Sequence, residues 1–236
     1  MATSVQPFSN GITPAVYKRA DENQMSGLNF VIDKTWDGEP VDHQPFRVHL
    51  EWVFQRQRGK PHKRAVKVTM EGPLFDDPPP ADELGGFCPE LYNYECFEIF
   101  FANNRDQYLE VEIGPHGHFL VLLLNGRRQP FNDGSELDLQ IENVFVGADV
   151  WRSTFEIPLA YFPPNLSKFN AYALHGLGPE RKYDALFPVT DGTYDEPDFH
   201  RLEFFQPLDV RKIIPETYNE TSFNDLHYGD LWKNVC

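Results

Sequence analysis

Three short strand-like segments in the middle of the chain constrain the fold most. They cover residues 94–101, 108–113 and 119–124, and the turn-like residues 103–106 and 115–117 separate them. The first two alternate in side-chain type with a period of two, and the third is apolar on both phases. This periodicity is typical of strands, because successive side chains of a strand point to opposite faces of a sheet. We therefore expect an antiparallel meander at the centre of the domain.

The segment before the meander is too rich in proline to form a regular element. Residues 71–89 contain five of the 20 prolines, namely Pro73, Pro78, Pro79, Pro80 and Pro89. Proline lacks a backbone N–H and fixes φ, which excludes a long helix or a central strand here. We expect a long ordered loop that either closes over a site or crosses the domain, because loops of this length are often functional.

Further strand signals extend over most of the chain. They lie at residues 30–32, 46–54, 65–70, 137–146, 151–157, 169–174 and 202–205, with a single helical turn at 158–162. Aromatic residues make up 14% of the sequence, and aromatic side chains between rigid turns favour strands. The sequence predicts an all-β fold: a two-sheet antiparallel β-sandwich with short helical turns.

The expected domain covers residues 30–215. Residues 1–29 are mostly polar and have no periodicity, so they are predicted to form a flexible N-terminal lead-in. Residues 216–236 form a polar tail, and we expect Leu231 and Trp232 to pack it on the domain.

The charge and the cysteines limit the partners and the compartment. The net charge of −15 argues against nucleic acid and anionic membranes, which need a basic surface. The longest apolar run has six residues, far fewer than the ~20 that a membrane helix requires. Cys88, Cys96 and Cys236 form no C-x-x-C motif, and no signal peptide is visible. These features predict a reduced, cytoplasmic protein, and they leave its oligomeric state open.

Three glutamates in the predicted meander are the sharpest candidate site. Glu110 and Glu112 share a face about 6–7 Å apart, and Glu98 can lie opposite one of them if residues 94–101 form the neighbouring strand. The face is either solvated or a concave polar surface that binds a small polar ligand. On a solvated face the partners would be Arg127, Arg128 or Arg152. Calcium is compatible with carboxylate oxygens, although the spacing of a dedicated calcium loop is missing.

Aromatic and histidine side chains supply the other candidates. Trp36 lies in a turn and Tyr94 begins the meander, so both could stack on a ligand. His116 and His118 are candidate transition-metal ligands that would need a third ligand, such as His175, His200 or a glutamate. The ordinary interpretation is that turn histidines are exposed. His175 is a candidate for a pocket, because it closes a strand ahead of a long loop.

The order of several motifs resembles carbohydrate-binding module family 9 and DOMON-like domains. The matching motifs are Tyr92-x-Tyr94-Glu95-x-x-Glu98-Ile99-Phe100-Phe101, Gln107-Tyr108-Leu109-Glu110-Val111-Glu112, Pro115-His116-Gly117 and Phe155-Glu156-Ile157-Pro158-Leu159. A closer resemblance is to the uncharacterised animal protein family that includes the human chromosome 4 open reading frame 33 product. Its motifs here are Thr35-Trp36-Asp37-Gly38, Tyr161-Phe162-Pro163-Pro164-Asn165, Ala173-Leu174-His175-Gly176 and Asp198-Phe199-His200. The resemblance covers residues 30–205 and implies a β-sandwich but no activity.

The favoured function is a cytosolic module that binds a small polar molecule such as a carbohydrate. Its candidate ligand-binding residues are Trp36, Tyr94, Glu98, Glu110, Glu112, Arg127 and His175. The alternative is an enzyme in which Glu98, Glu112 and His175 move protons on a small polar substrate. A haem protein, as some DOMON relatives are, ranks last. The sequence requires no cofactor.

Overall fold

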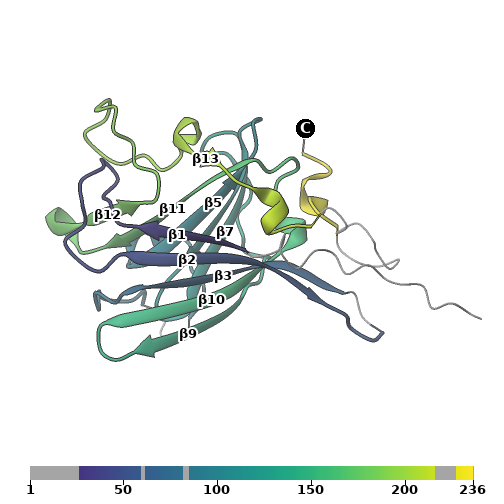
Figure 1. Cartoon of the computed structure of the whole chain (residues 1–236), viewed down its shortest axis with the longest axis horizontal. Coiled ribbons are helices and arrows are strands. Elements are labelled where there is room, and N and C mark those ends of the chain that lie inside the picture. Colours follow the sequence, from purple (N-terminus) through teal and green to yellow (C-terminus); the bar gives the residue numbers. More distant parts are fainter. Residues whose placement is uncertain (1–26, 60–61, 82–84, 216–226, 236) are drawn as a thin grey trace, which may run out of the picture.

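Two sheets stack face to face to form the protein. The computed structural model describes residues 27–59, 62–81, 85–215 and 227–235. In Figure 1 the strands β1, β2, β3, β10 and β9 form one layer in front of β11, β5 and β7. The predicted all-β, two-sheet sandwich is confirmed.

The five-stranded sheet is antiparallel throughout. Its order across the sheet is β1 (Leu28–Ile32), β2 (Phe46–Gln55), β3 (Lys63–Pro73), β10 (Val150–Pro158) and β9 (Gln140–Val146).

The eight-stranded sheet contains the meander expected from the sequence. Its main order is β12 (Lys182–Ala185), β11 (Lys168–His175), β5 (Cys96–Ala102), β6 (Gln107–Ile113), β7 (His118–Asn125) and β4 (Gly86–Phe87). The short strands β13 (Gln206–Pro207) and β8 (Pro130–Asn132) pair with β11 and β7. Among the strands of the described residues, only β4 runs parallel to its neighbour.

The helical elements of the described residues are single 3₁₀ turns. They are η1 (Leu91–Asn93), η2 (Leu159–Tyr161), η3 (Gly178–Glu180), η4 (Leu202–Phe204), η5 (Val210–Lys212) and η6 (Asp230–Trp232). Among these residues, no helix is long and apolar enough to cross a membrane.

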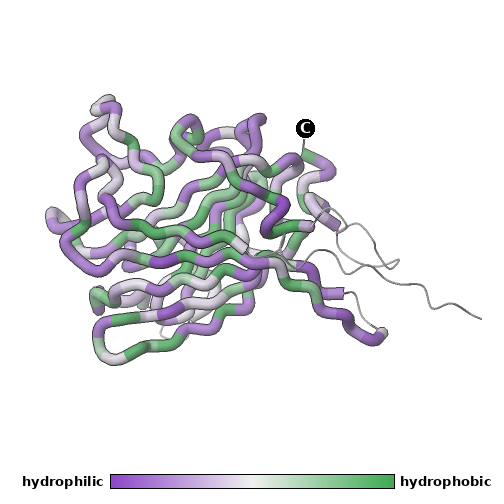
Figure 2. The backbone as a smooth tube through the Cα atoms, viewed as in Figure 1, coloured by the Kyte–Doolittle hydropathy of each residue, from purple (hydrophilic) through white to green (hydrophobic). Residues whose placement is uncertain are grey.

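The eight-stranded sheet is buried on both of its faces. Phe97, Ile99 and Phe101 of β5 point inward to the core between the two sheets. On the outer face, Cys96, Phe100 and Ala102 of β5 join a second apolar cluster, which we call the outer cluster. Every residue of β5 and β6 is buried. Figure 2 accordingly shows these central strands as mostly hydrophobic and many of the surrounding loops as hydrophilic.

The expected helical turn at residues 158–162 is confirmed as η2, whereas two expectations need correction. Residues 202–205 form the 3₁₀ turn η4 and not a strand, with the Phe205 N–H donating to the Leu202 carbonyl at 3.3 Å. This turn places Leu202 and Phe205 in the outer cluster. The strand expected at residues 137–146 begins only at Gln140.

The proline-rich segment runs across one end of the sandwich. The Glu95 carboxylate accepts hydrogen bonds from the Phe75 N–H at 2.9 Å and the Asp77 N–H at 3.2 Å. Asp77 in turn accepts the Gly176 N–H at 2.5 Å. The segment is therefore attached both to the start of β5 and to the end of β11.

The ends of the chain are described only in part. Residues 1–26 and 216–226, which include most of the expected lead-in and tail, lie outside the described residues. Trp232 is buried in the core between the sheets, and its indole N–H donates to the Tyr161 carbonyl at 2.9 Å. Leu231 packs against the same core.

Gly72 gives the fold a specific test. The register pairs the preceding Glu71 with Arg47, and a Cβ added at Gly72 would overlap the Phe46 ring. We expect Gly72→Ala to lower the free energy of unfolding by about 1–3 kcal/mol, the usual cost of overpacking. Gly114→Ala is the matched control, since its Cβ would meet Leu91 at an ordinary 3.5 Å. Urea denaturation measures both, and equal stability of the two variants would contradict this packing.

Candidate functional site

Three carboxyl groups meet on the outer face of the eight-stranded sheet. Glu98 of β5 pairs with Glu112 of β6, and Glu110 lies two residues away on the same face. The predicted juxtaposition of these side chains is therefore present in the structure. Their exposed fractions are 2% for Glu98, 4% for Glu110 and 0% for Glu112. The outer face is thus a buried surface and not a solvated one.

Burial changes the protonation of these groups. It raises the pKa of Glu110 to about 7, although the positive charge of Arg128 opposes the shift. Burial, and then the charge of Glu110, raises the pKa of Glu98 well above its usual range. Burial, and then the charges of Glu98 and Glu110, does the same to Glu112. The group therefore retains protons at neutral pH.

Several of the carboxyl oxygens have room for a further hydrogen bond. Within the described residues, no N–H or O–H group donates to Oε2 of Glu110 or to either oxygen of Glu112. Glu110 and Glu112 lie close enough for a proton on one to bridge to the other. Buried polar atoms normally have partners, so these oxygens are available to bind a proton, a water molecule or a ligand.

A cavity of about 360 Å³ opens above Glu98 and Glu110. This volume lies within the range of small-molecule sites. The lining residues come from strands of the outer face and from the loops over it: Tyr92, Asn93, Glu98, Glu110, Leu122, Arg128, Leu174, Tyr183, Glu196, Pro197, Phe199 and His200. We call this the outer cavity.

Hydrogen bonds and ring contacts hold the loop of the outer cavity in place. Phe199 stacks on Tyr172 with ring centroids 3.9 Å apart. The Tyr108 hydroxyl accepts the backbone N–H of Arg128 at 2.9 Å and lies 2.7 Å from Nδ1 of His200. The single hydroxyl proton is therefore free to be donated to His200. Arg128 also pairs with Asp198 at 2.7 Å.

His200 is neutral and lines the outer cavity. Burial and then the charge of Arg128 lower its pKa to about 4. When the Tyr108 hydroxyl donates to Nδ1, the neutral ring carries its proton on Nε2 and can donate to a ligand. From the sequence, His200 was a candidate only as a metal ligand. Its hydrogen bond with Tyr108 could not be expected, because the two residues are 92 positions apart in the chain.

The arginines expected beside the glutamates have other partners. Arg127 pairs with Glu203 at 2.6 Å, and Arg152 pairs with Glu71 on the five-stranded sheet. Arg128 alone of the three lines the outer cavity.

The aromatic candidates do not line the outer cavity. Trp36 and Tyr94 both pack against the outer cluster. The backbone N–H of Trp36 donates to the backbone carbonyl of Tyr183. Tyr183 itself does line the outer cavity. Tyr94 lies instead beside the proline-rich segment, in a small cleft with His116 and His118.

The histidine candidates also lie away from the glutamates. His118 is 2% exposed and His116 lies on the surface. Neither belongs to a group of three potential metal ligands within the described residues. His175 occupies the inner face of β11, opposite to Glu98, and its ring stacks on Phe75. The structure thus separates His175 from the two glutamates with which an acid–base role was expected.

Metal binding at the glutamates has limited support. Cys96, Glu98 and Glu112 offer three ligand atoms within 4.8 Å of one another. Calcium takes six to eight oxygen ligands, and this group supplies two carboxylates and a thiol. Burial also raises the pKa of Cys96, which disfavours a thiolate ligand.

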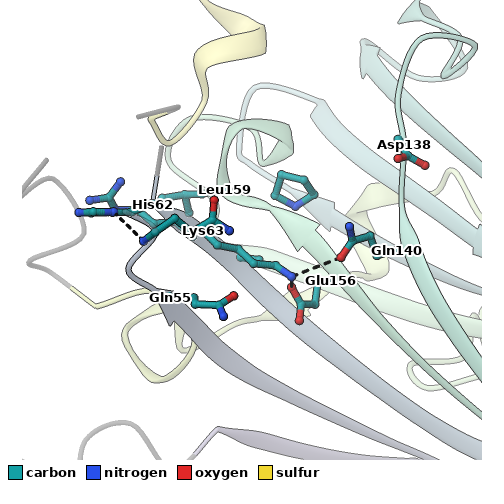
Figure 3. A pocket seen from close by; sticks show the side chains of 11 residues that line it. Gln55, His62, Lys63, Asp138, Gln140, Glu156 and Leu159 are labelled. Atoms are coloured by element: carbon teal, nitrogen blue, oxygen red, sulfur yellow. Dashed lines mark hydrogen bonds and ion pairs between the residues drawn. The ribbon is translucent and has the colours of Figure 1, made fainter. Parts of the chain in front are cut away.

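A larger cavity of about 510 Å³ lies beside β3, β9 and β10. Figure 3 shows its Lys63 side chain directed at Gln140 and Glu156. The Lys63 ammonium pairs with Glu156 at 2.5 Å and lies 3.4 Å from the Gln140 oxygen. The charges of Lys63 and Glu156 in this larger cavity already neutralise each other, so the outer cavity is the stronger candidate site.

Comparison with known proteins identifies clear relatives of the chain. The UPF0462 protein C4orf33 homolog of Mus musculus is 40% identical over 210 residues, which cover 87% of this chain and 100% of that protein. The Homo sapiens UPF0462 protein C4orf33 is 38% identical over 210 residues, covering 87% of this chain and 96% of the human protein. No family model matches the chain.

A solved structure shares the fold of this chain at low sequence identity. A putative carbohydrate-binding protein from Bacteroides uniformis matches with a TM-score of 0.58 and 15% identity, covering 79% of this chain and 87% of that chain. A carbohydrate binding module family 9 from Caldicellulosiruptor kristjanssonii in complex with cellotriose has a TM-score of 0.45 and 12% identity, over 74% and 79% of the two chains. The expected resemblances to the animal family and to carbohydrate-binding sandwiches are confirmed.

The raised pKa values predict an unusual dependence of stability on pH. The folded protein holds protons on these carboxyl groups that the unfolded chain releases near its ordinary pKa of 4.5. Their contribution to stability is therefore full below that pKa and is lost as the pH rises through about 7. We expect Glu110→Gln, which stays neutral, to raise the free energy of unfolding at pH 8 by on the order of 2 kcal/mol.

Urea denaturation at pH 5 and pH 8 checks this expectation. The gain should be smaller at pH 5, where wild-type Glu110 is already protonated. The exposed Glu142 of β9 provides the control Glu142→Gln, which should leave the pH profile unchanged. A Glu110→Gln profile parallel to that of the wild type would contradict the assignment.

Proposed function

The chain belongs to the UPF0462 protein C4orf33 family, and we propose that this member binds a small polyhydroxylated molecule, a sugar or polyol, in the outer cavity. The observation that carries the proposal is a preformed cavity over buried carboxyl groups that hold protons near neutral pH. Such groups are costly to bury, and a ligand that completes their hydrogen bonds reduces that cost.

The polar groups of the outer cavity suit hydroxyl groups. A hydroxyl both donates and accepts hydrogen bonds, and so does a carboxyl group that holds a proton. Glu98 and Glu110 can therefore donate a hydrogen bond to a ligand hydroxyl or accept one from it. The neutral His200 ring supplies a further donor at Nε2. A fully ionised ligand of negative charge would be repelled by the glutamates.

The apolar walls of the cavity suit the ring of a sugar. Tyr92, Tyr183 and Phe199 line it with aromatic surface, on which the C–H groups of a sugar can pack. The Bacteroides uniformis protein of the same fold is named for carbohydrate binding, and we propose the same class of ligand here.

An enzyme on the same scaffold is the second candidate. The pKa of Glu110, raised to about 7, would suit a general acid or base at neutral pH. Its partner would be the neutral His200 of the same cavity, because His175 lies on the opposite face of β11.

The test is isothermal calorimetry of the protein with a panel of monosaccharides, disaccharides and polyols. We expect binding of at least one member and about tenfold weaker binding by Glu110→Ala, which removes the carboxyl group and its hydrogen bond to a hydroxyl. Glu51→Ala, on the five-stranded sheet, is the control and should bind as the wild type does. Absence of binding across the panel, or equal affinity of Glu110→Ala, would overturn the proposal.

Glu110→Gln separates a binding module from an enzyme, because the amide keeps a hydrogen-bond donor and acceptor but cannot transfer a proton. In an enzyme, this variant would abolish turnover of the bound compound while binding persists. In a binding module, the wild-type protein returns the compound unchanged after prolonged incubation, as product analysis by mass spectrometry would show.

A further inference from the structure

A second polar cluster lies at the end of the sandwich, between the sheets. It contains His43 from the loop before β2, His175 at the end of β11 and Asp184 of β12. Asp184 is 1% exposed and His175 is 7% exposed. We call it the end cluster, and it is separate from the outer cavity because His175 and Asp184 lie on the inner face of their strands.

Three ligand atoms of the end cluster converge on one point. His43 Nε2 lies 3.2 Å from Asp184 Oδ2, and His175 Nε2 lies 3.6 Å from the same oxygen. All three atoms lie within 4.8 Å of one another. In a tetrahedral zinc site with ligands at ~2.0–2.1 Å, neighbouring ligand atoms are ~3.3 Å apart. The two shorter separations are close to this spacing without any movement of the chain.

The hydrogen bonding of His43 directs its Nε2 atom into the end cluster. Its Nδ1 lies 2.9 Å from the Gln44 carbonyl, which can only accept, so Nδ1 carries the proton. The Nε2 atom then faces Oδ2 of the Asp184 carboxylate at 3.2 Å. Burial lowers the pKa of His43, but its hydrogen bonds to Asp184 and Gln44 outweigh this effect and raise it, so without a metal ion a proton on Nε2 fills this contact. Two lone pairs facing each other repel unless a proton or a metal ion lies between them. A carbonyl partner on the far nitrogen is also the usual arrangement for a metal-binding histidine.

Two atoms of the end cluster are buried and have no hydrogen-bond partner outside it. Among the described residues, the polar contacts of Asp184 Oδ2 are those with His43 and His175, and His175 Nε2 faces only this oxygen. The His175 ring is held by stacking on Phe75 with centroids 3.5 Å apart and planes at 3°. Phe75 is fixed in turn by the Glu95 carboxylate. The stacking therefore holds His175 Nε2 toward the centre of the cluster.

From this geometry we propose that His43, His175 and Asp184 bind a divalent transition-metal ion, with zinc as the ion that fits best. Two imidazoles and one carboxylate are a ligand set that zinc accepts, and three protein ligands leave a fourth position for water. The ion would join the loop before β2 to β11 and β12. Through Phe75 and the Asp77–Gly176 bond, it would also anchor the proline-rich segment.

Cobalt titration of the metal-stripped protein tests the site directly. We expect one equivalent of Co²⁺ to produce the visible absorption of a tetrahedral site, and zinc to displace it. Zinc at about a hundred times its dissociation constant should raise the melting temperature by several degrees. Absence of a tetrahedral cobalt spectrum at one equivalent would overturn the proposal, whatever the variants do.

Two variants assign the ligands. We expect His43→Gln and Asp184→Asn to weaken cobalt binding at least tenfold, and His116→Gln, a surface histidine outside the cluster, to bind as the wild type does. Circular dichroism of each variant verifies that it is folded. His43 is the more exposed of the two histidine rings, so its variant is the less disruptive one. Undiminished binding by a folded His43→Gln, or loss of binding in His116→Gln, would place the metal elsewhere and overturn the proposal.

Discussion

The burial of the eight-stranded sheet on both faces determines where this protein can hold charge. One face packs on the five-stranded sheet, and the loops around η4 cover the other with Phe199, Leu202 and Phe205. A carboxylate on such a strand loses its hydration, and the penalty in real proteins is several kcal/mol per ion. Glu98, for example, therefore retains its proton well above the usual pH range.

The alternation of the strands distributes two polar sites over opposite faces of the same elements. On β12, Tyr183 lines the outer cavity and the next residue, Asp184, belongs to the end cluster. On β11, Leu174 and His175 are divided in the same way. The two sites share a backbone but no side chain, so a variant of one can be studied without removing the other. The proposed sugar site and the proposed metal site are therefore independent claims.

The sequence predicted the local geometry well wherever the periodicity was strong. The alternation of residues 94–101 and 108–113 put Glu110 and Glu112 on one face and allowed Glu98 to lie opposite one of them. The register shows that Glu98 lies opposite Glu112. The sequence pattern failed for residues 202–205, because a short apolar run buries its side chains equally well as a 3₁₀ turn.

The long-range contacts were beyond the sequence pattern. His43 and Asp184 are separated by 141 positions, 184 − 43, and neither belongs to a motif that indicates a ligand. The strand β12 has only four residues, too short for a clear alternation. Tyr183 was missed as a cavity residue for the same reason, since the pairing of β12 with β11 brings it over the glutamates. Phe199 was missed because it reaches the cavity through a long-range contact, its stacking on Tyr172.

The central claim is that the outer cavity contains carboxyl groups protonated near neutral pH. Carbon-13 NMR of protein labelled at the glutamate carboxyl carbon measures their titration directly, with Glu110→Gln identifying one signal. We expect the Glu110 signal to titrate with a midpoint near the pKa of about 7. The Glu98 and Glu112 signals should titrate well above the usual pKa range of a glutamate. Titration of every glutamate at the ordinary pKa of about 4.3 would contradict the central claim.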